Sequence, residues 1–427
     1  MIKVFSNSWA LFIGLLLLMI GNGLQGTLLG LRGALEGFDA SIMAWVMSAY
    51  FAGFMIGSRL APGMIQRVGH VRVFAALASM ISAGFILYAA VPDPIAWAAM
   101  RFVVGFCFSG VYVVCESWLN DASTNETRGK TLSLYMITQM VGIISAQGIV
   151  NFADAGSYAL FVVMSVLVSI SFAPILLSAT PAPVFQGTKP MTLRQLYETS
   201  PLGCIGMFFM GAVFAGMFGM AAVFGSEKGL SVADITLFVA VIYFGGMVLQ
   251  YPVGWLSDRM DRRRLITFVC LLAAITMIPA ALFGGNFIML MIGGFVLGGL
   301  SNPLYSLLIA YTADYLQPED MAAASGGLMF INGGGAVLGP FIVGWMMTTL
   351  GADFYFVFMG VNFAIIAAYG FYRMTRRAAP SVEDTSAYAY VGPQASPVAV
   401  EVAQEYAIDL AEHEDEIAEA EAEAKPT

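Results

Sequence analysis

The sequence predicts an all-α membrane protein whose helices cross the bilayer twelve times. Of its 427 residues, 59% are hydrophobic and only 11% are charged, whereas a soluble protein carries about 25% charged residues. Apolar runs of bilayer-spanning length recur between Trp9 and Arg373. Backbone polar groups inside a bilayer must be satisfied within the protein, so these long runs indicate helices, and none alternates as a barrel strand would.

Six apolar runs lie on each side of a polar, proline-containing stretch. The first run, from Trp9 to about Leu31, leads directly into further spans, so we interpret it as a retained helix and not as a signal peptide. The other expected spans are residues 41–65, 72–91, 94–120, 131–152, 156–178, 202–224, 231–257, 263–283, 286–314, 321–348 and 352–374.

These runs divide the chain into four parts. We expect an N-terminal six-helix bundle (residues 1–178), a central cytoplasmic linker (179–201) and a C-terminal six-helix bundle (202–374). Residues 375–427 form a tail with twelve acidic residues against one lysine from Ala378 onward. We expect this tail to be solvated and disordered or partly helical, with binding of a partner as the alternative.

Lysine and arginine placement predicts the orientation, because such residues concentrate in cytoplasmic loops. The loops after spans 2, 4, 6 and 8 and the segment after span 12 carry most of them, whereas the opposite loops hold little beyond Arg32 and Lys228. An even number of spans then places both termini in the cytoplasm.

The two halves repeat short patterns. AYFAG (Ala49 to Gly53) resembles IYFGG (Ile242 to Gly246), and GFCFSG from Gly105 resembles GFVLGG from Gly294. This alignment puts Leu290 opposite Arg101 and Tyr305 opposite Glu116, so the packing glycines are repeated and the charges are not. Parallel repeats of this kind place a substrate site between the halves near the bilayer midplane.

The segment Gly254 to Arg264, GWLSDRMDRRR, has a glycine, then Asp-Arg, then a basic cluster. It resembles the loop between the second and third helices of each half in the major facilitator superfamily. The first-half copy departs from that pattern, with Gln66 at the acidic position and Pro62 at the glycine position.

Three further stretches resemble a narrower bacterial group of this superfamily, the YcaD-like transporters. They are RVGHVRVFAAL (67–77), ESWLND with RGKTLSLYM (116–121 and 128–136), and SGGLMFINGGGAVLGP (325–340). The resemblance covers all twelve expected helices and leaves only the tail outside. It implies a secondary transporter of the bacterial cytoplasmic membrane, in which two bundles rock about a central site, and it names no substrate.

Arg101 lies about 10 Å into the fourth span, at a depth where a charge is expensive and marks either function or a paired structural group. With Gly105 it fits an R-x-x-x-G pattern that superfamily members often carry and that is implicated in proton coupling. We expect a cavity cation that binds substrate or tunes a carboxylate; the alternative is an arginine bonded to carbonyl groups of neighbouring helices. No Asp or Glu lies in the middle of any span, so an obvious proton-carrying partner is missing.

Glu116 follows Arg101 by roughly 22 Å along the helix axis, near the expected cytoplasmic edge. We expect Glu116 to pair with Arg67 or Arg128 in a cytoplasmic gate; contact with substrate is the alternative. The second-half candidates for the same gate are Asp258, Arg259, Arg262 and Asp314.

Polar residues inside the spans need partners, so they face the bundle interior or a wet cavity. The best cavity candidates besides Arg101 are Asn22, Gln25, Tyr112, Gln147 and Asn302, with Arg32 at the outer mouth. Bonding between helices is the alternative for each amide. Gly335, Gly339 and Pro340 form a G-x-x-x-G-P pattern in the eleventh span, which we expect to act as a hinge.

Several classes of function are not supported by the sequence. Four cysteines inside apolar runs and two histidines suggest neither a metal site nor a catalytic set, and no phosphate-binding G-x-x-x-x-G-K-[ST] motif appears. We therefore expect no enzyme activity, no cofactor and no nucleotide or nucleic-acid partner.

The prediction is a proton-coupled transporter of a neutral, weakly anionic or amphiphilic small solute, with efflux as the preferred direction. Its partners would be that solute, protons and the lipid bilayer. The rivals are an uncoupled facilitator, and a membrane sensor or scaffold that acts through the acidic tail.

Overall fold

The structure is a computed structural model that describes residues 2–121, 123, 125–174, 191–316, 320–376, 388, 390–392, 395–396, 398–400 and 402–403. Within these residues the chain is helical and contains no strand. The first six helices are α1 (Ile2–Leu35), α2 (Ala40–Val68), α3 (His70–Ala90), α4 (Pro94–Asp121), α5 (Asn125–Val150) and α6 (Ala159–Ser171). The others are α8 (Leu193–Thr199), α9 (Pro201–Glu227), α10 (Val232–Ser257), α11 (Arg262–Leu282), α12 (Phe287–Ala313), α13 (Met321–Leu350) and α14 (Phe354–Met374).

Eleven of the described helices are long and apolar enough to cross a membrane, and their bounds follow the expected spans closely. The remaining expected span, 156–178, corresponds to α6, of which 13 residues are described. Capping side chains explain several of the boundaries, because an oxygen at the N-cap accepts a free helical N–H. Asp39 accepts from Ile42 at 2.8 Å at the start of α2, and Ser231 accepts from Asp234 at 3.2 Å at the start of α10.

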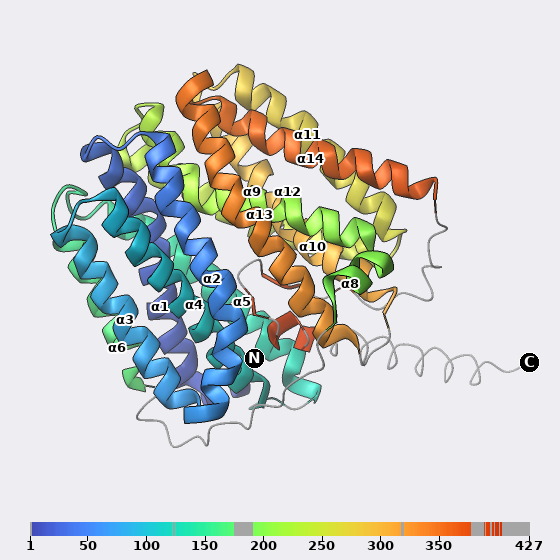
Figure 1. Cartoon of the computed structure of the whole chain (residues 1–427), viewed down its shortest axis with the longest axis horizontal. Helices are drawn as coiled ribbons and strands as arrows, with labels where there is room; N and C mark the ends of the chain where they lie inside the picture. Colours follow the sequence, from blue (N-terminus) through green and yellow to red (C-terminus); the bar gives the residue numbers. More distant parts are fainter. Residues whose placement is uncertain are drawn as a thin grey trace, which may run out of the picture.

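The helices form two bundles, α1–α6 and α9–α14 (Figure 1). The bundles meet through α1, α2 and α5 on one side and α9, α10 and α13 on the other. Several of these contacts lie at the expected outer end, which carries the α1–α2, α5–α6 and α9–α10 connections. There Ser41 donates to Thr348 at 2.9 Å, and Asn151 donates to Thr236 at 3.0 Å.

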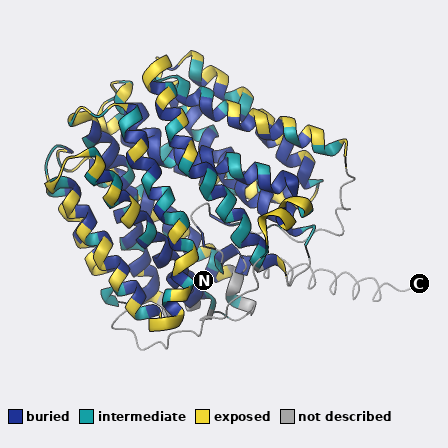
Figure 2. Cartoon of the chain, in the orientation of Figure 1, coloured by how far each residue is buried: buried dark blue, intermediate teal, exposed yellow. Residues whose placement is uncertain are grey.

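Exposed residues lie along the outside of both bundles (Figure 2), and many of them are large and hydrophobic. Phe152, Ile95 and Leu282 are among the most exposed. Apolar surface on this scale marks a membrane-facing protein.

Glycines at helix crossings correct the expected register of the repeat. A Cβ at Gly105 would collide with the carbonyl oxygen of Tyr50, and a Cβ at Gly298 would collide with that of Ile242. Gly298, not Gly294, therefore holds the position equivalent to Gly105, one helical turn from the expected match. The spacing of glycines in GFVLGG fits both registers, and only the contact of α12 with α10 distinguishes them.

In the corrected register, Gly294 lies opposite Arg101 and Ile309 lies opposite Glu116. The charges of α4 are still not repeated in α12. Tyr112 and Tyr305 become equivalent, as are the tyrosines of AYFAG and IYFGG.

Part of the tail differs from the solvated segment that we expected. Between Tyr388 and Ala403, described residues such as Val391, Ser396 and Val400 are buried. They pack between the two bundles at the expected cytoplasmic end, the end at which α2, α4, α10 and α12 finish. Residues 404–427, with much of the acidic part of the tail, lie outside the described residues.

Candidate functional site

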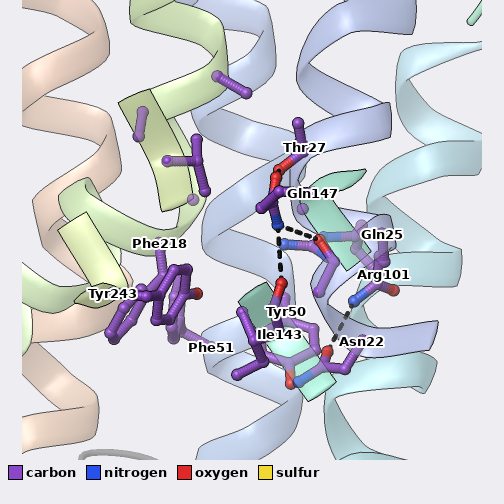
Figure 3. Close-up of a pocket in the computed structure, with 16 residues that line it drawn as sticks. Asn22, Gln25, Thr27, Tyr50, Phe51, Arg101, Ile143, Gln147, Phe218 and Tyr243 are labelled. Atoms are coloured by element: carbon purple, nitrogen blue, oxygen red, sulfur yellow. Dashed lines mark hydrogen bonds between the residues drawn. The ribbon is translucent and has the colours of Figure 1, made fainter. Parts of the chain in front are cut away.

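A small cavity, called the central cavity below, lies between the two bundles and is lined by residues of both (Figure 3). It has about 40 Å³ of free space, enough for a few water molecules. The first bundle contributes Asn22, Gln25, Thr27, Tyr50, Arg101 and Gln147, together with apolar neighbours. The second bundle contributes Phe218, Gly219, Ala221, Ala222, Val239 and Tyr243.

The two walls of this central cavity differ in chemistry. Amide, hydroxyl and guanidinium groups come from α1, α2, α4 and α5, whereas α9 and α10 supply small, apolar and aromatic side chains. On the second wall, the rings of Phe218 and Tyr243 stack with their centroids 5.1 Å apart. The cavity therefore offers polar partners on one wall and apolar or aromatic surface on the other.

Arg101 is the one charged residue among those that line the central cavity, and its side chain is buried. Its guanidinium lies over the Tyr50 ring, 4.5 Å from the centroid, and its Nη2 donates to the sulfur of Met47 at 3.2 Å. Its Nε has no hydrogen-bond partner in the part of the chain that the structure describes, and no ion pair of Arg101 is found there. A buried cation without an anion is costly, so an anionic group that entered this cavity would find a ready partner.

The amides of the cavity form a partly completed network. Thr27 donates to Gln147 Oε1 at 2.8 Å, and Gln147 Nε2 bonds the backbone of α1 and α5. Asn22 Nδ2 donates to the Tyr112 hydroxyl at 3.0 Å, and Gln25 Nε2 donates to Asn22 Oδ1 at 3.4 Å. Gln25 Oε1 is buried and lacks a partner among the described residues, so the network leaves at least one acceptor for a guest.

The structure thus brings four of the cavity candidates together on the central cavity: Asn22, Gln25, Arg101 and Gln147. Tyr112 reaches it only through its bond to Asn22. Asn302 lies at the crossing of α12 and α10, where its amide donates to Gly298 O at 3.1 Å. Arg32 lies at the end of α1, where it pairs with Glu36 at 2.6 Å and donates to the Gly156 carbonyl.

Glu116, the first-half gate candidate, has partners among the described residues that we did not expect. Its carboxylate accepts from the Tyr135 hydroxyl at 2.6 Å and from the backbone N–H of Ser396 at 2.8 Å. Arg67 is exposed near the end of α2, and the side chain of Arg128 lies outside the described residues. The sequence did not indicate Ser396 as a partner of Glu116, because Ser396 belongs to the tail, which we expected to be solvated.

The second-half gate candidates form a compact cluster at the start of α11. Arg262, whose side chain is 2% exposed, forms an ion pair with Asp314 at the end of α12 and lies 3.9 Å from Asp258. Arg259 points elsewhere and lies over the Trp255 ring, 4.2 Å from the centroid. The pairs join elements of the second bundle to each other and do not bridge the two bundles.

The hinge candidates lie where α13 crosses α9 within the second bundle. A Cβ at Gly335 would collide with the carbonyl oxygen of Phe208, and a Cβ at Gly339 would press on Ala212. Pro340 follows within α13. These glycines permit close helix packing. That Gly335, Gly339 and Pro340 act as a hinge remains a proposal.

Some cavity residues were missed by the sequence reasoning. Tyr50 and Tyr243 belong to the repeated motifs AYFAG and IYFGG, so the repeat was an unused signal for both. Arg59 was also missed; its guanidinium lies 3.6 Å from the centroid of the Phe330 ring and joins α2 to α13. Within the described residues, no group of three His, Cys, Asp or Glu side chains is placed to hold a metal ion.

Comparison with known sequences identifies relatives along nearly the whole helical part of the chain. A sequence profile described as Major Facilitator Superfamily matches residues 11–285 and 202–398. A protein of Escherichia fergusonii (strain ATCC 35469) described as "Uncharacterized MFS-type transporter YcaD" is 25% identical over 342 residues, which cover 79% of this chain and 88% of that protein. A protein of the same description from Escherichia coli O9:H4 (strain HS) is 26% identical over 353 residues, covering 81% and 90%.

Solved structures show the same arrangement of helices. The crystal structure of the nucleoside transporter NupG matches with a TM-score of 0.71 and 15% identity, over 87% of this chain and 100% of that chain. A bacterial homolog to the human lysosomal transporter Spinster, in an inward-facing and unoccupied conformation, matches with a TM-score of 0.65 and 16% identity, over 96% and 97%. At these identities the likeness concerns the fold alone.

Proposed function

Since the chain belongs to the major facilitator superfamily, as a YcaD-like transporter of several membrane spans, we propose that it is a secondary active transporter working by alternating access. Its relatives and its fold are those of membrane transporters and not of enzymes. We place both termini in the cytoplasm of a bacterial cell, from the distribution of lysine and arginine. Proton coupling and export are our preferred mode, and both rest on the resemblance.

The solute that best suits the central cavity is a small amphiphile with an anionic group. The observation that carries this proposal is Arg101, a buried cation without an ion pair among the described residues, on the polar wall of the cavity. Amides of the same wall would bond the rest of the polar end, and the stacked rings of Phe218 and Tyr243 would contact the apolar end. A fixed cation in a site of low dielectric favours an anionic guest over its neutral analogue.

A ligand-stabilisation experiment tests this assignment. Purified protein is heated with phenylacetate or with the neutral phenylacetamide, and the unfolding temperature is recorded across a concentration series. We expect phenylacetate to stabilise the parent protein and the Arg101→Lys variant, and to have no effect on Arg101→Met. Equal stabilisation by the acid and the amide, or stabilisation of Arg101→Met by the acid, would contradict the role of Arg101.

An uncoupled facilitator is the second candidate, and one observation favours it. None of the residues that line the central cavity is a carboxylate, so the cavity itself holds no carboxyl group to carry a proton. Uptake of a stabilising ligand into proteoliposomes, with and without an imposed pH gradient, distinguishes the two modes. Proton coupling requires that the gradient drive accumulation above equilibrium, whereas a facilitator only equilibrates.

A further inference from the structure

The described residues between Tyr388 and Ala403, called the tail plug below, lie between the two bundles. In Figure 1 this segment is drawn in red at the end of the molecule where the N-terminus also lies. Its side chains are largely inaccessible to solvent: Val400 and Ala403 are 0% exposed, and Val391 is 1% exposed. Such burial requires specific neighbours from the bundles.

The second bundle holds the beginning of the plug. The backbone N–H of Tyr388 donates to Asp258 Oδ1 at 2.7 Å, and its hydroxyl accepts from Gln250. The N–H of Val391 donates to Ser306 Oγ, and Ser306 donates back to the Val391 carbonyl, both at 3.0 Å. Burial raises the pKa of the Tyr388 phenol, so this side chain stays neutral at physiological pH.

The first bundle holds the rest of the plug. The N–H of Ser396 donates to Glu116 Oε2 at 2.8 Å, and Ala399 and Val402 line a small cavity together with Glu116. At Gly392 the plug packs against Met136 of α5, whose sulfur would lie 3.3 Å from an added Cβ. A hydrogen bond from an N–H to a carboxylate is stronger than one between neutral groups, so Ser396 is a principal anchor.

One short segment therefore uses its backbone to bind Ser306 of one bundle and Glu116 of the other. We propose that the tail plug is a built-in inhibitor, which binds in the expected cytoplasmic opening between the bundles, beside a cavity of about 560 Å³ that Tyr388 and Tyr390 help to line, and holds the bundles apart there. While the plug is bound, it would obstruct the passage of solute from that side to Arg101. The bundle ends also cannot approach each other, as alternating access requires. Occupancy of the opening stands on the contacts alone, whereas inhibition of transport rests on the proposed function.

The plug predicts that a thiol beneath it is protected from modification. The reporter is Met136→Cys in the full-length chain, since Met136 is 4% exposed and packs against the plug at Gly392. Its labelling by N-ethylmaleimide is compared in two backgrounds, Ser396→Pro and Ser396→Ala. Proline removes the N–H that binds Glu116, whereas alanine keeps it. We expect labelling to accelerate about tenfold or more with proline, as loss of a hydrogen bond to a carboxylate implies. Alanine should accelerate it clearly less, because alanine keeps the N–H and removes only the hydroxyl, which accepts from the Val398 N–H at 3.2 Å.

Two additions make the result specific to the plug. The chain without the reporter supplies the background, because all four native cysteines are buried. A synthetic peptide with the sequence of residues 386–404 should restore slow labelling in the Ser396→Pro background, and a scrambled peptide should not. Val400→Asp is a second way to expel the plug, with the half-buried Val398→Asp as its milder match.

The proposal is overturned if Met136→Cys reacts rapidly in the chain with an intact plug, or if the proline and alanine backgrounds label equally. The labelling needs no substrate, so failure of phenylacetate to bind would leave this result standing. If phenylacetate is transported, Ser396→Pro should also raise its flux into proteoliposomes. If labelling accelerated and the flux stayed unchanged, the segment would still occupy the opening, but it would not inhibit transport.

Discussion

The two bundles share a repeat but place their charges in different parts of the structure. In the first bundle, Arg101 and Glu116 lie between the bundles, and the equivalent positions in the second bundle are Gly294 and Ile309. In the second bundle, Arg262 and Asp314 pair at the junction before α11. The equivalent first-bundle junction, before α3, carries His70.

This difference separates architecture from function. The junctions of both bundles need a bond that ties the start of one helix to the end of another: Arg262 bonds Asp314, and His70 bonds Ser117 at 2.8 Å. In the first bundle the corresponding bond joins a histidine to a serine hydroxyl. Arg101 and Glu116 have no charged counterpart at the equivalent positions of the second bundle, so the fold does not require a charge at these two positions. The predictions below test whether the junction residues determine stability and whether Arg101 determines binding.

The largest loss of stability should come from the charged junction. Asp314→Asn leaves Arg262 buried beside a neutral partner, and breaking a buried pair in this way costs about 3–5 kcal/mol. Thermal unfolding in detergent measures the loss. Arg259→Ala is the matched control, because Arg259 is exposed and should change stability by less than about 1 kcal/mol. Similar values for the two variants would show that the junction charge is not structural.

The next effect concerns the glycine crossings that the bundles share. Gly105→Ala and Gly298→Ala each push a methyl group into a backbone carbonyl, which should cost about 1–3 kcal/mol. Gly294→Ala is the control, because its methyl group would meet the Phe238 ring at 2.8 Å, and a ring can shift. Unfolding temperatures should fall less for Gly294→Ala than for Gly298→Ala. The reverse order would restore the register expected from the sequence.

The bond between His70 and Ser117 should contribute less to the free energy of unfolding than the pair of Arg262 and Asp314. Ser117→Ala removes the hydroxyl that bonds His70 and should cost about 0.5–1.5 kcal/mol, the usual range for such a bond. When Ser117→Ala and Asp314→Asn are measured under the same conditions, the two stability losses show how much each junction contributes. A loss as large as that of Asp314→Asn would mean that the first bundle depends on its junction as strongly as the second.

Much of the fold could be predicted from the sequence, because long apolar runs and capping residues such as Asp39 and Ser231 mark helices by local chemistry alone. The repeat register could not, since closely spaced glycines near Gly298 fit two alignments and only helix contact selects one. The burial of Ser396 could not be predicted from the sequence either. Valine and alanine in an acidic tail suggest solvation, and their burial depends on surfaces from both bundles.

The candidate site was predictable to the extent that polar residues within a span must face the interior, which led to Asn22, Gln25, Arg101 and Gln147. The partners of Glu116 were not predictable. The expected pairing assumed that a carboxylate near arginine-rich loops binds arginine. A backbone N–H from a distant segment satisfies the same carboxylate, and no pattern in the sequence distinguishes these outcomes.

Replacement of Arg101 should have the smallest effect on stability. Arg101→Met replaces a buried cation, which has no ion pair among the described residues, with an apolar side chain of similar length. Exchanges of buried charge for hydrophobic groups are often neutral or stabilising. The loss of its contact with the Tyr50 ring is worth about 1–2 kcal/mol in the opposite direction. We therefore expect the unfolding temperature of the ligand-free protein to stay within a few degrees of the parent value, while stabilisation by phenylacetate disappears. A large drop in the ligand-free protein would make Arg101 a structural residue like Arg262, and the contrast between the bundles would fail at its central point.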